Sequence, residues 1–192
     1  MRKPVSVTPR EAKRIERRLT HVDALIWRLT SETGLRVSDA LNMRVNDVRG
    51  LNLEVWESKS KKIRQVTLSE GLFRDLKRHC ADRSPDHWLF PSKRSYRKPY
   101  NRMTYHRGLK AAQVAASPSA RTASAHSARK LYAQKIYKKT KSVKDVQKAL
   151  QHTRIETTAT YLDMDSAALL EKSEKKPIFA VKIKRFFENL RP

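Results

Sequence analysis

Hydrophobic residues recur at helical spacing through most of the chain. Four of them fall at positions 0, 3, 4 and 7 of one repeat and mark a buried helix face: Val22, Leu25, Ile26 and Leu29. Gly34 is the expected end of this helix. Upstream, Thr8, Pro9 and Glu11 form a capping box with proline at the first helical position, which predicts a helix to about residue 19.

Strand-like alternation first occurs shortly after these helices. Leu51, Leu53 and Val55 alternate with polar residues over residues 51–57, which predicts a strand. Residues 64–68 are its expected partner, and residues 58–63 form the connecting turn. Together they predict a small antiparallel hairpin.

Helical patterns resume after the hairpin. Ser69 begins a predicted helix to about residue 83, Asn101 begins one to about residue 115, and His126 opens one to residue 139. Ser142 with Asp145 caps the next helix, and Tyr161 lies on a further short segment at residues 158–161. Residues 88–91 read as an apolar part of the core, residues 92–102 as a basic loop and residues 116–125 as a linker. The fold class is therefore mainly α with a small antiparallel β-sheet (α+β).

The last eighteen residues, 175–192, form a separate apolar tail after a domain at residues 1–174. Phe179, Val181 and Ile183 alternate like a strand, and a helical repeat follows at Ile183, Phe186, Phe187 and Leu190. Asp165 is the expected cap of a helix before this tail. An apolar terminal element must be buried, either on its own domain or on a neighbouring copy. We expect donation to a neighbouring copy in an assembly, with the tail folded back on its own domain in the free protein.

The amino-acid composition indicates the kind of partner that the protein binds. The 192 residues carry a formal net charge of +24, which is typical of a protein that binds a polyanion. A general RNA-binding protein is the alternative, but its charge usually lies in a low-complexity tail, whereas here it is spread through patterned helices. No apolar run is long enough to span a membrane. The single cysteine, Cys80, excludes an internal disulfide and a cysteine-based zinc site.

Six side chains form a set suited to phosphoryl transfer from DNA to a protein hydroxyl: Arg36, Lys59, His126, Arg129, His152 and Tyr161. A phosphodiester under attack gains charge on its non-bridging oxygens, and fixed arginines bind two such oxygens at once. A tyrosine hydroxyl has a pKa of about 10 and needs a base or a positive field to attack. A lysine or histidine can protonate the leaving oxygen. We expect neither a metal nor another cofactor, because the cations are side chains.

Five short motifs hold these residues in a fixed order. They are TGLRVSD at residues 33–39, Lys59 followed by KIRQVTL at residues 62–68, HSAR at residues 126–129, LQH at residues 150–152, and TATY at residues 158–161. In order and spacing, from about residue 8 to residue 165, the chain resembles the catalytic domain of the tyrosine recombinases, the group of phage integrases and Xer-type resolvases.

The resemblance implies a fold, an activity and roles. The fold would be the tyrosine recombinase catalytic domain, acting on double-stranded DNA in the cytoplasm, at the nucleoid. Tyr161 would attack the scissile phosphate to form a 3′-phosphotyrosine, and Lys59 would protonate the leaving 5′ oxygen. His126 would take the tyrosine proton or assist the arginines, and the phosphate oxygens would be held by Arg36, Arg129 and His152. Strand exchange would need four protomers, with a monomer or dimer when free.

The basic hairpin, the basic loop and the helix after it supply the candidate DNA contacts: Lys61, Lys62, Arg64, Lys93, Arg94, Arg97, Lys98, Arg102, Tyr105, His106 and Lys110. Lys61 and Lys62 have two interpretations: they take part in catalysis, or they belong to a basic hairpin that only contacts backbone phosphate. For residues 92–102, a solvated loop is the alternative.

Three departures from the family pattern bear on activity. Asp39 replaces a glutamate, Ala128 replaces a leucine, and Gln151 replaces the glycine before the second histidine. The family's separate N-terminal core-binding domain has no counterpart in the sequence, so either the chain clamps DNA differently or it is part of a longer protein. Two rival functions stay open: type IB topoisomerase-like relaxation of DNA, and DNA-binding regulation without catalysis.

Overall fold

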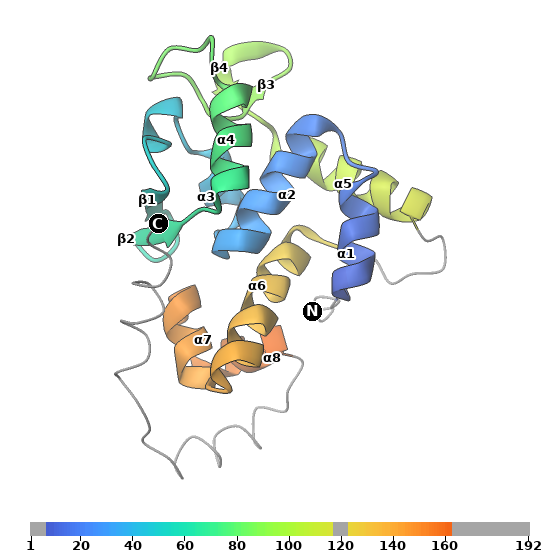
Figure 1. The fold of residues 1–192 in the computed structure, drawn as a ribbon, viewed down its shortest axis with the longest axis vertical. Helices are drawn as coiled ribbons and strands as arrows, with labels where there is room; N and C mark the ends of the chain where they lie inside the picture. Colours follow the sequence, from blue (N-terminus) through green and yellow to red (C-terminus); the bar gives the residue numbers. More distant parts are fainter. Residues whose placement is uncertain (1–6, 117–122, 163–192) are drawn as a thin grey trace.

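The computed structural model describes residues 7–116 and 123–162, and every structural statement below concerns these residues. The predicted cap at Asp165, the tail at residues 175–192 and the boundary between tail and domain lie outside them. Most of the described chain is helical, with two small antiparallel hairpins (Figure 1). The predicted fold class is confirmed.

The first helix begins at its predicted cap but ends at Glu16, before the predicted residue 19, and the second helix ends at the predicted glycine. Helix α1 (Pro9–Glu16) starts at the Thr8 capping box. Helix α2 (His21–Thr33) is capped by Thr20 and ends at Gly34, whose φ of +67° requires the left-handed conformation that glycine adopts most readily. Helix α3 (Val37–Leu41) and a single 3₁₀ turn, η1 (Val45–Asp47), follow.

Strands β1 (Asn52–Glu57) and β2 (Lys62–Thr67) form the predicted hairpin. Their register pairs Asn52 with Thr67 and Glu57 with Lys62, so the turn covers residues 58–61 and is shorter than predicted. In β1 the buried positions are Leu53, Val55 and Glu57. The inward face of this strand therefore carries a carboxylate at the end that leads into the turn.

Helix α4 (Glu70–His79) follows, and its end near residue 80 comes earlier than predicted. A second hairpin, β3 (Pro91–Ser92) with β4 (Ser95–Pro99), lies where a basic loop was predicted. Its backbone pairing is short, and the outward side chains are mostly basic. The sequence of β4 therefore lacks the alternation of apolar and polar residues by which a strand is predicted.

Helix α5 (Arg102–Ala116) begins at Asn101, whose side-chain oxygen accepts a hydrogen bond from Met103 N at 2.7 Å. Helices α6 (Ala125–Thr140), α7 (Val143–Leu150) and α8 (Ile155–Leu162) complete the described chain. Ser124 and Ser142 cap α6 and α7. In Figure 1, α6, α7 and α8 lie together at one end of the molecule, away from α4 and the second hairpin.

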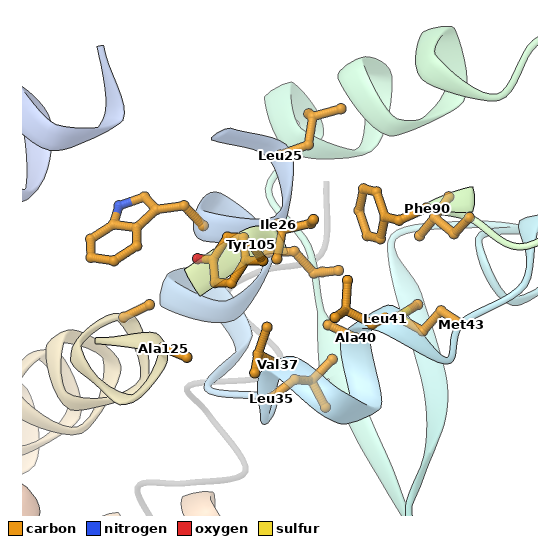
Figure 2. Packing of buried hydrophobic residues seen from close by; sticks show 14 of the residues in the cluster. Leu25, Ile26, Leu35, Val37, Ala40, Leu41, Met43, Phe90, Tyr105 and Ala125 are labelled. Atoms are coloured by element: carbon orange, nitrogen blue, oxygen red, sulfur yellow. The ribbon is translucent and has the colours of Figure 1, made fainter. Parts of the chain in front are cut away.

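The larger core surrounds α2. Ile26, Leu29 and Trp27 of α2 are fully buried, and Leu35, Ala40 and Phe90 pack into the same cluster (Figure 2). A smaller cluster joins the last three helices through Ala133, Val146, Leu150, Tyr161 and Leu162. Helix α6 contributes Ala125 and Ala128 to the larger cluster and Ala133 to the smaller one. The two cores therefore meet along α6, at the level of Arg129.

Across the described ranges, no helix combines the length and apolar character needed to cross a bilayer.

Candidate active site

Arg36 lies at the junction between α2 and α3. The chain turns at Gly34, buries Leu35, and reaches Arg36 in extended conformation as the N-cap of α3. Arg36 Nη1 donates to Glu57 Oε2 at 2.6 Å, and its side chain keeps 19% of its surface exposed. The guanidinium is thus held on one edge and open on another.

Arg129 joins three segments that are distant in sequence. Its Nη1 donates to the carbonyl of Gly34, its Nη2 donates to the carbonyl of Leu150 at 2.6 Å, and the side chain is almost fully buried. Burial, reinforced by the charges of Arg36 and Arg64, lowers the pKa of Arg129 to about 10. Arg129 therefore stays protonated at neutral pH.

Glu57 is a site residue that the motifs did not indicate. Its carboxylate is fully buried and meets three guanidinium groups: Arg36 at 2.6 Å, Arg64 at 3.2 Å and Arg129 at 3.5 Å. Burial raises the pKa of Glu57, but Arg36 and Arg129 outweigh it and the net pKa is lowered. Glu57 is therefore an anion that balances the cluster. Its signal in the sequence was a carboxylate at an inward position of an alternating strand.

Tyr161 and His126 are in contact. Tyr161 Oη lies 2.9 Å from His126 Nδ1, and the rings meet edge-on with centroids 6.3 Å apart. Burial raises the pKa of Tyr161, although Arg129 and Arg36 oppose this rise. Desolvation lowers the pKa of His126, and the charges of Arg102 and Arg129 lower it further. At neutral pH a protonated phenol therefore faces a neutral imidazole, which is the arrangement needed for proton transfer.

His152 also contacts the ring of Tyr161. The ring centroids of His152 and Tyr161 are 5.0 Å apart, and His152 Nδ1 lies 3.1 Å from Thr158 Oγ1. Burial, followed by the charges of Arg129 and Arg36, lowers the pKa of His152 to about 3. His152 is therefore neutral, and it can bind a phosphate oxygen only as an N–H donor.

The turn before His152 has the left-handed backbone for which the family uses glycine. Gln151 adopts φ 51° and ψ 43° and accommodates this conformation without a glycine. Gln147 holds the backbone of His152 through two hydrogen bonds. The Gln147 carbonyl accepts from His152 N at 3.0 Å, and Gln147 Nε2 donates to the His152 carbonyl at 3.1 Å. Gln147 was not predicted, and its sequence signal was no more than a polar residue on a helix.

Lys59 lies in the exposed turn between β1 and β2. It is within electrostatic range of the site, because its charge is among those that lower the pKa of His126. The six predicted catalytic side chains are thus brought to one region. No group of three His, Cys, Asp or Glu side chains suited to a metal ion occurs in residues 7–116 and 123–162.

Nine predicted DNA contacts lie on the surface: Lys61, Lys62, Lys93, Arg94, Arg97, Lys98, Arg102, His106 and Lys110. Arg102 is also near the site, since its charge lowers the pKa of His126. These nine side chains are free to meet a polyanion, and their contact with DNA stays a prediction.

Arg64 and Tyr105 are corrections to the predicted DNA contacts. Arg64 points inward from β2 opposite Val55, donates to the carbonyls of Thr33 and Gly34, and is 4% exposed. Tyr105 is fully buried in the larger core (Figure 2). Neither side chain offers a surface to DNA, because each fills an interior position of its strand or helix.

Comparison with known proteins decides the family. The family model described as the phage integrase family matches residues 7–167. The chain belongs to the phage integrase family. A probable integrase/recombinase of Bacillus subtilis, YoeC, is 32% identical over 135 residues, which cover 69% of this chain and 72% of YoeC. A probable integrase/recombinase of Acholeplasma phage L2 is 27% identical over 158 residues, covering 77% of this chain and 51% of that protein.

Solved structures of the family share the fold. The XerA recombinase superposes with a TM-score of 0.71 at 22% identity, covering 93% of this chain and 66% of that chain. The XerH recombinase bound to its difH substrate superposes with a TM-score of 0.69 at 18% identity, covering 91% of this chain and 55% of the XerH chain. The motif-based resemblance is confirmed. The chain spans about three quarters of YoeC, but only about half of the phage relative and of XerH.

Proposed function

We propose that this chain is the catalytic part of a site-specific DNA recombinase that breaks and rejoins strands through a 3′-phosphotyrosine. The observation that supports this most directly is the 2.9 Å contact between Tyr161 Oη and His126 Nδ1. It pairs a nucleophile with a base beside two arginines, all within one chain.

The first step is attack of Tyr161 Oη on the scissile phosphorus. His126 Nδ1 accepts the phenolic proton as the new P–O bond forms. Arg36 and Arg129 bind the non-bridging oxygens, where charge grows in the transition state, and His152 adds one neutral N–H donor. Exposure of one edge of Arg36 gives the phosphate a route to the cluster.

The leaving group departs as the P–O5′ bond breaks, and Lys59 protonates the 5′ oxygen. The products are a 3′-phosphotyrosine and a free 5′ hydroxyl. Because the new ester conserves the phosphodiester energy, a 5′ hydroxyl can attack it and restore the strand without a nucleotide cofactor. Reversal of the same proton transfers completes ligation.

The proposed partner is double-stranded DNA at the nucleoid. The net charge of +24 and the nine exposed basic or histidine side chains named above support this proposal. We propose a homotetramer for strand exchange, with the tail at residues 175–192 donated between protomers and a domain at residues 1–174. A solved lambda integrase tetramer bound to a Holliday junction shares the fold, with a TM-score of 0.63.

The test is a covalent-trapping assay. Duplexes that bind the Tyr161→Phe protein are selected from a randomised pool, nicked beside each candidate phosphate, and incubated with wild-type protein. A protein–DNA band that survives denaturation is expected. It should vanish with Tyr161→Phe and persist with Tyr137→Phe, a matched loss of one hydroxyl on α6.

The rival functions give different results. Binding without any covalent band would support regulation without catalysis and overturn the proposal. A band accompanied by relaxation of supercoiled plasmid at protein concentrations where the protein is monomeric, with no strand exchange, would support a topoisomerase.

A further inference from the structure

The position of Lys59 depends on its turn rather than on its own side chain. Lys59 is exposed and forms no hydrogen bond or ion pair with any residue that the structure describes. A lysine side chain has a flexible stem of four carbons and loses much conformational entropy when it is held in one conformation. To donate a proton, the Lys59 ammonium must lie within hydrogen-bond reach of the leaving oxygen. Its own side chain does not fix this position, so the backbone on both sides of Lys59 must be held.

The residue before Lys59 is held by Asp39. Ser58 Oγ donates to Asp39 Oδ1 at 2.8 Å, and Ser58 N donates to the same oxygen at 3.1 Å. Asp39 is 2% exposed on α3, and its other oxygen lies 3.8 Å from Arg36 Nη1. One carboxylate thus bridges the turn and the arginine.

The residue after Lys59 is held by Glu57. Ser60 Oγ donates to Glu57 Oε2 at 3.0 Å, and that oxygen also accepts from Arg36 Nη1 at 2.6 Å. The Glu57 carbonyl accepts from Lys61 N at 2.9 Å, and Lys61 takes a left-handed φ of 53° that closes the turn. A second carboxylate therefore connects the turn to the same guanidinium.

The two bridges are built alike. Each neighbour of Lys59 carries a hydroxyl, each hydroxyl binds a buried carboxylate, and both carboxylates face Arg36. Hydrogen bonds to charged acceptors are stronger and shorter than neutral ones, so the two serines restrain the turn more than an ordinary turn contact does.

We propose that Ser58 and Ser60 are positioning residues that hold Lys59 for protonation of the leaving oxygen, through Asp39 and Glu57. The inference rests on the proposed cleavage reaction and extends it. It makes the general acid depend on the same carboxylates that orient the phosphate-binding Arg36.

The test compares two leaving groups in each variant. Matched nicked duplexes carry either oxygen or sulfur at the bridging 5′ position of the scissile phosphate. In both, the bond from Tyr161 Oη to phosphorus forms and the bridging bond breaks. The alkoxide must receive a proton from Lys59, whereas a thiol has a pKa of about 8.5 and leaves as the thiolate.

We expect Ser58→Ala and Ser60→Ala each to slow cleavage of the oxygen substrate about tenfold, a fraction of what a general acid contributes. On the sulfur substrate both variants should cleave at nearly the wild-type rate. Lys59→Ala should show the same pattern with a larger loss. Ser58→Thr and Ser60→Thr keep the hydroxyl and should restore the oxygen rate.

Thr67→Val is the matched control. Thr67 Oγ1 donates to Asn52 Oδ1 at 2.8 Å at the far end of the same hairpin, so its loss should leave both rates unchanged. The oxygen-to-sulfur ratio is measured within one protein, and partial misfolding therefore cancels from it.

Equal slowing of both substrates by the serine variants, or no slowing of either, would overturn the inference. Failure of the proposed function is distinguishable from this, because the wild-type protein would then cleave neither substrate.

Discussion

At the residue scale, the site places two neutral groups in a field of cations. The imidazoles of His126 and His152 both have lowered pKa values, since burial and nearby guanidinium groups disfavour a further positive charge. Burial also keeps Tyr161 protonated. The cluster thus combines cationic guanidinium groups with a neutral His126 imidazole, which is the combination that the proposed reaction requires.

The first prediction concerns the pH dependence of cleavage. The pKa of His126 is lowered from its ordinary value of 6.5, so the base form dominates throughout the neutral range. The single-turnover trapping rate should be flat above 6.5 and fall only as pH drops through the lowered pKa. The acid limb should disappear in His126→Gln, at a lower overall rate. An acid limb centred above 6.5 would contradict this assignment.

At the scale of elements, the turn after α2 joins the core to the site. Gly34 has a φ of +67°, and its carbonyl accepts hydrogen bonds from both Arg64 and Arg129. A Cβ added at Gly34 would lie 2.8 Å from Cε1 of Tyr132 on α6. The close approach of α2 and α6 therefore requires a glycine here.

Gly34→Ala should destabilise the protein and slow cleavage. Left-handed strain and overpacking together should cost about 2 kcal/mol or more in the free energy of unfolding. Urea denaturation measures the cost, and trapping measures the rate. Gly50→Ala is the control, because a Cβ there has no neighbour within 4 Å and its φ is not positive. Equal stability of the two variants would contradict the argument.

At the scale of the whole molecule, one chain supplies all six predicted catalytic side chains. Arg36 and the hairpin come from the larger core, whereas Tyr161 and Leu150 belong to the smaller one. Helix α6 connects the two cores and carries both His126 and Arg129 (Figure 1). Tyr161 therefore contacts His126, the proposed base, within the same chain.

This arrangement predicts cleavage by each protomer on the phosphate that it binds. Mixing Tyr161→Phe with Lys59→Ala should give no more covalent product than the two proteins give separately, because every site retains one defect. Lys59 is exposed and unpartnered in the described part of the chain, so its loss should not affect folding. A rise in product on mixing would show that the tyrosine comes from a neighbouring protomer.

Much of the fold could be predicted from local pattern, and six candidate site residues could be proposed from it. Helix ends could be placed from single residues, because capping satisfies backbone groups within a few residues of the cap. The examples are Thr8, Ser69, Ser142 and Gly34. The candidate catalytic residues could be proposed from the sequence because few side-chain types can attack, protonate or bind a phosphate.

The burial of several polar and aromatic side chains was decided by tertiary structure. Arg64 and Tyr105 look like surface contacts in the sequence, yet they fill interior positions, and Glu57 became the anion of the site. The sequence by itself determined most of the helices, the first hairpin and the residue types proposed for catalysis. Which side chains face the interior depends on the distant segments that pack against each strand and helix, and short-range periodicity carries no information about those segments.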